Sequence, residues 1–388
     1  MYIKRVTNIS SKLDRKSQFL FGPRSTGKTS YITNELSERI VLRWDLLNTR
    51  LRRRAEEDPG ILYEELSSCG LDSGLVVIDE IQKVPELLDE VHRLIEETDF
   101  RFLLTGSSAR KLVRSGVNLL GGRAGKCYMY PFVYPEVKDM DFSLEHIFSS
   151  GLLPEAFLSS SPDSVLEDYI DTYLYDEIQS EGAVRNLPAF SRFLEVAAIS
   201  NGSILNYTNI ANDVGLSKNS IREWYQILTD TLLGFTLQPF TGTKKRKPIE
   251  TAKYYLFDVG ILRSLLGCSL PVETQSEYGM FFETFMINEI KAYLSYNGKE
   301  RRNPLSYWRS TSGFEVDAII GSETAIELKT SKKLIPRDLR GLKAFSEESI
   351  AKKYIVVCRE ERKRLIDDLF LVYPWKEFLE DLWNNRII

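Results

Sequence analysis

The 388-residue chain has few of the side chains that build most metal centres and acid–base triads. It contains only two histidines, His92 and His146, and neither lies in a recognisable motif. Its four cysteines are far apart and form no Cys-x-x-Cys pair. This pattern fits a reducing compartment and argues against a structural zinc site. A histidine-based metal centre or a serine–histidine–aspartate hydrolase is therefore not expected.

Long apolar runs are also absent from the sequence. No run approaches the roughly 18 residues needed to cross a bilayer, and the N-terminal stretch MYIKRVTNISSK has no apolar signal segment. There is no long Gly/Ser linker. The formal net charge of −4 argues against a basic coat over the whole surface but is compatible with a local basic patch. We expect a cytoplasmic protein with no membrane contact and with closely packed domains.

The composition is that of a globular protein, with 43% hydrophobic and 27% charged residues. At this length two or three domains are expected. In the first third of the chain, short apolar strands alternate with helical patterns, which predicts a parallel α/β sheet. The expected strands cover residues 18–21, 40–44, 75–79, 101–106 and 126–132, and the expected helices cover 28–38 and 85–97.

The sequence GPRSTGKT at residues 22–29 has the spacing of a phosphate-binding loop. Its glycines let backbone N–H groups surround phosphates, and the helix that follows directs its positive end at them. Lys28 is expected to bind the β- and γ-phosphates of ATP, and the Thr29 hydroxyl is expected to bind Mg²⁺. The residues expected to contact the nucleotide are Gly22, Pro23, Arg24, Ser25, Thr26, Gly27, Lys28, Thr29 and Ser30.

Two adjacent carboxylates end the buried strand LVVID at residues 75–79. Asp79 is placed to hold Mg²⁺, and Glu80 is placed to polarise the attacking water as a general base. An Asp-Glu pair also ends strands that have no catalytic role. Together with the upstream loop, however, the pair favours ATP hydrolysis over binding alone.

Two further residues complete the predicted ATPase site. Ser107 follows the strand 101–106 and is expected either to orient the water or the γ-phosphate, or simply to cap a helix. Arg123, in the glycine-rich segment LLGGRAGK, is expected either to stabilise the transition state in a neighbouring subunit or to be an ordinary surface arginine.

The motifs GPRSTGKT, IDEIQKVPELLDEVHRLIEE, FLLTGSSA and GGRAGKCYMYPF occur in the order that characterises a known group. In this order the chain resembles the predicted AAA+ ATPases of bacteria and archaea, over roughly residues 15 to 385. The resemblance implies an AAA+ fold, the cofactors ATP and Mg²⁺, a homo-oligomer that is often a ring, and a C-terminal region of unknown function. It assigns Lys28 and Thr29 to phosphate and metal, and Asp79 and Glu80 to metal and water. No second sensor arginine is identified.

Residues 203–231 have the pattern helix, tight turn, helix, with Gly215 at the turn and Ser217 capping the second helix. A strand, a basic turn and a second strand follow, as in the wing of a winged helix. This predicts a helix in the major groove and a wing on the phosphates of double-stranded DNA. The alternative is a protein-packing domain with a solvated basic turn. The expected DNA contacts are Lys218, Arg222, Lys244, Lys245, Arg246 and Lys247.

The last third of the chain gathers charged residues on predicted neighbouring elements. Glu283 lies on a helix, Asp317 on a strand, and Glu327 and Lys329 on the next strand. Carboxylates with a lysine can hold Mg²⁺ and stabilise a phosphate transition state. The order resembles the PD-(D/E)XK nuclease fold, which implies either a nuclease or a binding module. Charged strand ends on a solvated surface are the alternative explanation for Glu315 and Glu289.

The predicted fold class is α/β: an AAA+ P-loop sheet, a helical and winged-helix region, and a nuclease-like α/β domain. The expected boundaries are 1–135 for the ATPase core, 136–190 for a helical lid or linker, 191–262 for the winged helix and 263–388 for the nuclease-like domain. The predicted function is Mg²⁺-dependent ATP hydrolysis by the AAA+ module. This hydrolysis is expected to be coupled to the winged-helix and nuclease-like domains and to act on DNA or be regulated by it. The alternatives are an ATP-gated DNA nuclease and a nucleotide-dependent scaffold that binds a protein partner.

Overall fold

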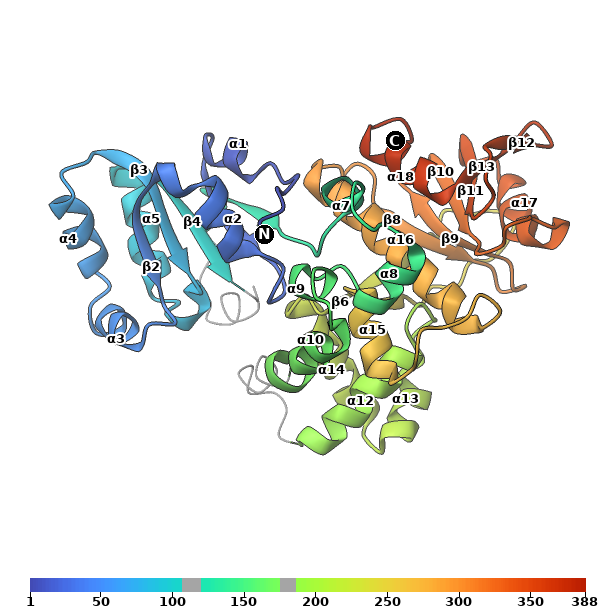
Figure 1. Cartoon of the computed structure of the whole chain (residues 1–388), viewed down its shortest axis with the longest axis horizontal. Helices are drawn as coiled ribbons and strands as arrows, with labels where there is room; N and C mark the ends of the chain where they lie inside the picture. Colours follow the sequence, from blue (N-terminus) through green and yellow to red (C-terminus); the bar gives the residue numbers. More distant parts are fainter. Residues whose placement is uncertain (107–119, 175–185) are drawn as a thin grey trace. The chain divides into compact units, whose positions relative to one another are not determined.

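The computed structural model describes residues 1–106, 120–174 and 186–388 (Figure 1). The chain divides into two compact units, one comprising Met1–Pro131 with Asp230–Leu233 and the other comprising Phe132–Thr229 with Gly234–Ile388. Each unit has its own sheet. The four-part division proposed from the sequence remains a proposal.

The first unit contains a five-stranded sheet in the order β2-β3-β4-β1-β5, with every neighbouring pair parallel. The parallel α/β arrangement predicted from the sequence is therefore confirmed. The last strand begins before residue 126 and ends well before residue 132; Pro131 has no amide hydrogen to extend the ladder. The strands are β1 Ser17–Phe21, β2 Ile40–Asp45, β3 Ser73–Asp79, β4 Asp99–Gly106 and β5 Ala124–Tyr128.

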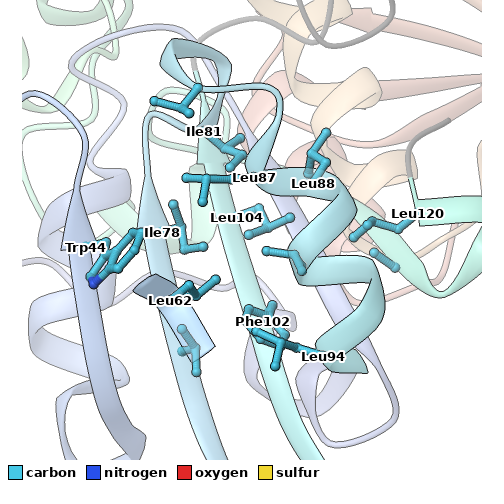
Figure 2. Packing of buried hydrophobic residues seen from close by; sticks show 14 of the residues in the cluster. Trp44, Leu62, Ile78, Ile81, Leu87, Leu88, Leu94, Phe102, Leu104 and Leu120 are labelled. Carbon is cyan, nitrogen blue, oxygen red and sulfur yellow. The ribbon is translucent and has the colours of Figure 1, made fainter. Parts of the chain in front are cut away.

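Both faces of this sheet are covered, because its strands are apolar on both sides. Phe19 and Phe21 belong to one core cluster, together with residues of α3, α4 and α5. Figure 2 shows Leu62 of α4 and Leu87 and Leu94 of α5 in this cluster. Leu20, between them, belongs to a second cluster with residues of α1 and α2. The period-two alternation of β1 thus supplies both cores. The helices are α1 Ile9–Leu13, α2 Lys28–Glu35, α3 Thr49–Glu57, α4 Ile61–Ser68 and α5 Leu87–Glu97.

The second unit begins with helices. The predicted helix, turn and helix are present: Gly215 ends α13 with a φ of +75°, and the Ser217 hydroxyl accepts a 3.1 Å hydrogen bond from the Ser220 amide at the start of α14. The apolar faces of both helices are buried. The helices are α7 Tyr134–Val137, α8 Leu144–Ser150, α9 Pro154–Phe157, α10 Pro162–Asp168, α12 Leu187–Ile199, α13 Tyr207–Val214, α14 Lys218–Asp230 and α15 Val259–Leu266, with a π-helical turn at Tyr169–Leu174.

An eight-stranded mixed sheet forms the rest of the second unit, in the order β12-β13-β11-β10-β9-β8-β6-β7. β6 pairs antiparallel with β7 and also parallel with β8, so this sheet crosses the boundary expected at residue 262. The strands are β6 Gly234–Pro239, β7 Lys253–Leu256, β8 Leu305–Arg309, β9 Glu315–Ile320, β10 Thr324–Leu328, β11 Lys353–Cys358, β12 Arg364–Ile366 and β13 Phe370–Pro374. The helices are α16 Ser276–Tyr296, α17 Arg340–Ser346 and α18 Trp375–Trp383.

Residues of α17 pack against β8, β9, β10, β11 and β13 in an apolar cluster that includes Trp308, Ala325 and Phe345. This packing fixes the sheet that carries the charged residues of the C-terminal region. Across the residues that the structure describes, no helix combines the length and the apolar character needed to cross a membrane.

Candidate functional site

The phosphate loop lies between β1 and α2, as the sequence predicts. Lys28 begins α2, and its side-chain nitrogen donates hydrogen bonds of 2.7 and 2.9 Å to the carbonyl oxygens of Gly22 and Pro23. Gly27 has a φ of +91°, which favours glycine. A Cβ on Gly22 would lie 2.5 Å from the carbonyl oxygen of Met129. The two glycines are therefore required by the path of the backbone around the lysine.

Arg5 supports this loop from outside the motif. Its side chain is only 5% exposed. Its guanidinium donates hydrogen bonds to the backbone oxygens of Thr26 at 2.6 Å, Tyr130 at 2.7 Å and Pro131 at 3.2 Å. Arg5 thus ties the loop to the segment that follows β5. Sequence reasoning missed it, because nothing around an arginine at position 5 signals a contact with residue 130.

The predicted carboxylates lie at the end of β3. Asp79 is 7% exposed, and it accepts a hydrogen bond from the hydroxyl of Thr105 on β4. Arg43 on β2 reaches it from the other side, at 3.7 Å between Nη2 and Oδ2. Glu80 has a φ of +60°, an uncommon conformation for a residue other than glycine. Its amide donates a 3.3 Å hydrogen bond to the Thr105 hydroxyl, and its carboxylate accepts one from the Gln82 side-chain amide.

Thr105 is fully buried and contacts both members of the carboxylate pair. The sequence analysis did not single out Thr105, which lies on β4 two positions before Ser107. Ser107 itself lies outside the described residues. A single polar residue inside the apolar strand RFLLTG was the signal that could have identified Thr105.

The remaining predicted residues of the ATPase site have separate surroundings. Thr29 and Ser30, in the first turn of α2, are exposed. Arg123 forms an ion pair with Glu96 on α5, and its side chain is 41% exposed. The ordering of β1, β4 and β3 in the sheet places Lys28, Thr105 and Asp79 along its carboxyl edge.

The four residues predicted for a nuclease-like site are brought together in the second unit. Lys329 donates a hydrogen bond of 2.5 Å to Glu327, and Asp317 accepts one of 2.7 Å from the backbone amide of Leu328. Burial acts to lower the pKa of Lys329, but the carboxylates of Asp317, Glu327 and Glu283 raise it above its usual range. Burial raises the pKa of the Glu327 carboxyl well above its usual value.

Two residues of β7 that the sequence analysis did not single out complete this acidic cluster. Lys253 is 3% exposed, and its ammonium lies 2.6 Å from Glu315 and 3.1 Å from Glu283. The Tyr255 hydroxyl also donates a hydrogen bond to Glu283. Burial acts to lower the pKa of Lys253, but these carboxylates hold it well above its usual value. Among the described residues, no three acidic, histidine or cysteine side chains form a group suited to a metal ion.

The basic turn after β6 contacts α17 and the residues that follow it. Glu348 accepts hydrogen bonds from the backbone amides of Lys244, Lys245 and Arg246 at 2.8, 2.8 and 2.9 Å. The Arg246 side chain forms an ion pair of 2.6 Å with Glu347, and the Lys245 side chain donates to the backbone oxygen of the same residue.

The other predicted DNA contacts differ from this turn. Lys218 and Arg222 are exposed on α14. Arg222 lies over the ring of Tyr207, with its guanidinium carbon 5.3 Å from the ring centroid. The basic side chains on α14 are therefore exposed to solvent, whereas Lys245 and Arg246 of the basic turn are bound to Glu347.

Comparison with known proteins divides the chain into three matches. Residues 14–138 match the family described as an AAA domain. Residues 142–271 match a domain of unknown function (DUF8612), and residues 278–378 match another (DUF4143). The last two matches carry no assigned activity.

Three similar proteins carry the description of uncharacterized proteins. Proteins of Mycobacterium tuberculosis and Mycobacterium bovis are each 27% identical over 369 residues, covering 91% of this chain and 79% of theirs. A protein of Methanocaldococcus jannaschii is 22% identical over 274 residues, covering 63% of this chain and 61% of its own.

Among solved structures, the Aeropyrum pernix Orc1 protein in complex with DNA overlaps 68% of this chain and 93% of its own, at 13% identity and a TM-score of 0.27. A likeness this slight says nothing about what this chain binds. The family match, the parallel sheet and the phosphate loop agree independently of it. Residues 14–138 therefore form an AAA domain that contains a P-loop.

Proposed function

We propose that the first unit hydrolyses ATP with Mg²⁺ and that this turnover controls the activity of the second unit. One observation carries the proposal. Lys28, Thr105 and the Asp79–Glu80 pair follow or end three adjacent parallel strands at one edge of the sheet. Ligands of open α/β sheets bind at this edge.

Each residue has a role that its contacts support. Lys28 binds phosphate oxygens, and the loop amides around it add hydrogen bonds. The exposed Thr29 hydroxyl and the Asp79 carboxylate are oxygen ligands of the kind that Mg²⁺ prefers, so these residues fit the metal. When bound, Mg²⁺ neutralises phosphate charge. Glu80 accepts the proton of the attacking water. Thr105 holds the Asp79 carboxylate and the Glu80 backbone amide, and the Gln82 side-chain amide donates to the Glu80 carboxylate.

The test is a steady-state ATPase assay on Lys28→Ala. We expect turnover to fall to background, because the phosphate charge loses its cation. Lys126→Ala is the matched control, since Lys126 is an exposed lysine on β5 of the same sheet. Retained hydrolysis in Lys28→Ala would refute the proposed site. If the wild-type chain binds ATP but does not turn it over, a nucleotide-dependent scaffold replaces the ATPase.

We further propose that double-stranded DNA binds the second unit through a winged helix formed by α13, α14, β6 and β7. The exposed Lys218 and Arg222 on α14 support this contact more strongly than the basic turn, which is held by Glu347 and Glu348. Lys218→Glu/Arg222→Glu should abolish binding, and Lys244→Glu should weaken it less. If α14 supplies two phosphate contacts, log K should fall with log salt at a slope of about −2. A salt-independent signal would indicate a protein partner instead.

We also propose that the chain forms a homo-oligomer, such as a ring, in which Arg123 contacts the nucleotide site of a neighbouring subunit. Arg123 is ion-paired with Glu96 in its own chain, so assembly would have to exchange this partner. Light scattering with and without ATP tests the assembly. A monomer under both conditions would leave Arg123 as a surface arginine.

A Mg²⁺-dependent nuclease is the second candidate function, because the buried Asp317 and Glu327 lie in one cluster with the half-buried Glu283 and Lys329. The assay compares DNA cleavage by the wild-type chain and by Asp317→Ala, with Mg²⁺ and with each nucleotide. Cleavage that depends on Asp317 would support a nuclease, and no cleavage under any condition would exclude it. The position of Lys253 bears directly on this choice.

A further inference from the structure

The acidic cluster of the second unit already contains a cation from the protein itself. We propose that the Lys253 ammonium takes the place of a divalent metal ion in this cluster, so that the cluster binds no metal while Lys253 is in position. The inference concerns a site separate from the ATPase site and does not depend on ATP hydrolysis.

The contacts of Lys253 are those of a bound cation. Its nitrogen lies between two carboxylates from different elements, Glu315 on β9 at 2.6 Å and Glu283 on α16 at 3.1 Å. The Tyr255 hydroxyl lies 3.5 Å away, and the ring of Tyr307 lies below it at 5.2 Å from nitrogen to centroid. With 3% of its surface exposed, the side chain leaves little solvent around the charge. A metal ion bound by Glu283 and Glu315 would have to displace it.

The charges of the cluster are nearly balanced without a metal ion. Four carboxylates take part, and three cations pair with them: Lys253 with Glu283 and Glu315, Arg309 with Glu315, and Lys329 with Glu327. The fourth carboxylate is Asp317, which interacts with both lysines. A divalent ion added to this set would leave an excess of positive charge in a partly buried region, which is unfavourable.

One acceptor in the cluster nevertheless remains unused. Glu327 is 6% exposed, and among the described residues its Oε2 atom has no hydrogen-bond partner. Buried carboxylate oxygens are normally satisfied. This oxygen also lies close to α17, since a Cβ on Gly341 would come within 3.2 Å of it. The cluster therefore keeps a ligand for a cation, whereas Lys253 occupies two others.

Removing the charge of Lys253 should create a metal site. The test is a calorimetric titration with Mn²⁺ in the absence of nucleotide. It compares four proteins: the wild-type chain, Lys253→Met, Lys253→Arg and the double variant Lys253→Met/Asp317→Asn. We expect Lys253→Met to bind Mn²⁺ at least ~10-fold more tightly than the wild-type chain, since Glu283 and Glu315, both half-buried, lose the cation between them. Lys253→Arg keeps the cation and should behave as the wild type. The double variant should lose the gain.

Two results would overturn the proposal. One is Mn²⁺ binding by the wild-type chain that Asp317→Asn abolishes, because the metal would then coexist with Lys253. The other is a folded Lys253→Met chain that binds no more Mn²⁺ than the wild type. Circular dichroism establishes whether the variant is folded. If the variant is not folded, a comparison of Mn²⁺ binding by the wild-type chain and by Asp317→Asn still tests the proposal. The proposal predicts equal and negligible binding by both proteins.

Discussion

Glu289 should make the stability of the second unit fall as the pH rises. This residue lies on α16 and is 2% exposed. Its carboxylate accepts hydrogen bonds of 2.8 Å from the Tyr134 amide and 2.9 Å from the Trp383 indole. Burial raises the pKa of Glu289 from its ordinary 4.5 to about 8, although these two hydrogen bonds act in the opposite direction.

The sign of the effect follows from proton binding. Between pH values of about 5 and 8, the folded chain holds a proton on Glu289 that the unfolded chain has released. The unfolding free energy therefore falls as the pH rises through this window. A difference of about 3.5 pH units is worth ~5 kcal/mol in total at ~1.4 kcal/mol per unit. Between a pH of about 5 and about 7, the loss from this group should be roughly 2 kcal/mol.

Urea unfolding, monitored by tryptophan fluorescence, measures the free energy of unfolding. The wild-type chain and Glu289→Gln are compared over the same series of pH values. Glutamine stays neutral, so the wild-type free energy of unfolding should fall relative to that of the variant as the pH rises. The lost acceptor for one of the two donors adds an offset that does not change with pH. Glu277→Gln, an exposed glutamate on the same helix, is the control. Parallel curves for wild type and Glu289→Gln would refute the buried protonation.

Three other substitutions test contacts within the first unit or within the second unit. Thr105→Val removes the hydroxyl that contacts Asp79, so ATP turnover should fall roughly 10–100-fold with little change in nucleotide affinity, as measured by kinetics and nucleotide titration. Arg5→Ala leaves the phosphate loop without its brace, and nucleotide binding should weaken by about 10-fold; unchanged affinity would mean that the loop holds its shape alone. Gly341→Ala places a Cβ against the backbone oxygen of Glu315, so thermal unfolding should reveal a loss of ~1–3 kcal/mol or more.

The parts of the site that the sequence predicts are those whose signals are local. The phosphate loop needs its glycines and Lys28 within eight consecutive residues, and Asp79 is marked by the apolar strand that it ends. The parallel sheet follows from the same alternation of buried strands and helices. These features depend on backbone geometry that neighbouring residues determine.

The residues that the sequence does not reveal act over long separations. Arg5 contacts Tyr130, which lies 125 positions along the chain, and Lys253 contacts Glu315, which lies 62 positions along it (315 − 253). Alternation places Lys253 and Tyr255 on one face of β7, but it does not say that this face is buried against α16 and β9. The strand pattern in KYYLF is therefore correct, whereas the charge that it buries is visible only in three dimensions.

The basic run at residues 244–247 shows how contacts change the meaning of a charge pattern. As a sequence it resembles a phosphate-binding wing, but Lys245 and Arg246 are engaged with Glu347, and Glu348 accepts three backbone amides of the turn. These partners would have to be exchanged for phosphates, so each such contact would contribute less to DNA affinity than an unengaged lysine would. A run of basic residues predicts a nucleic-acid surface only where its side chains have no hydrogen-bond or ion-pair partners within the chain. Because Lys245 and Arg246 have such a partner in Glu347, α14 is the stronger candidate for the DNA contact.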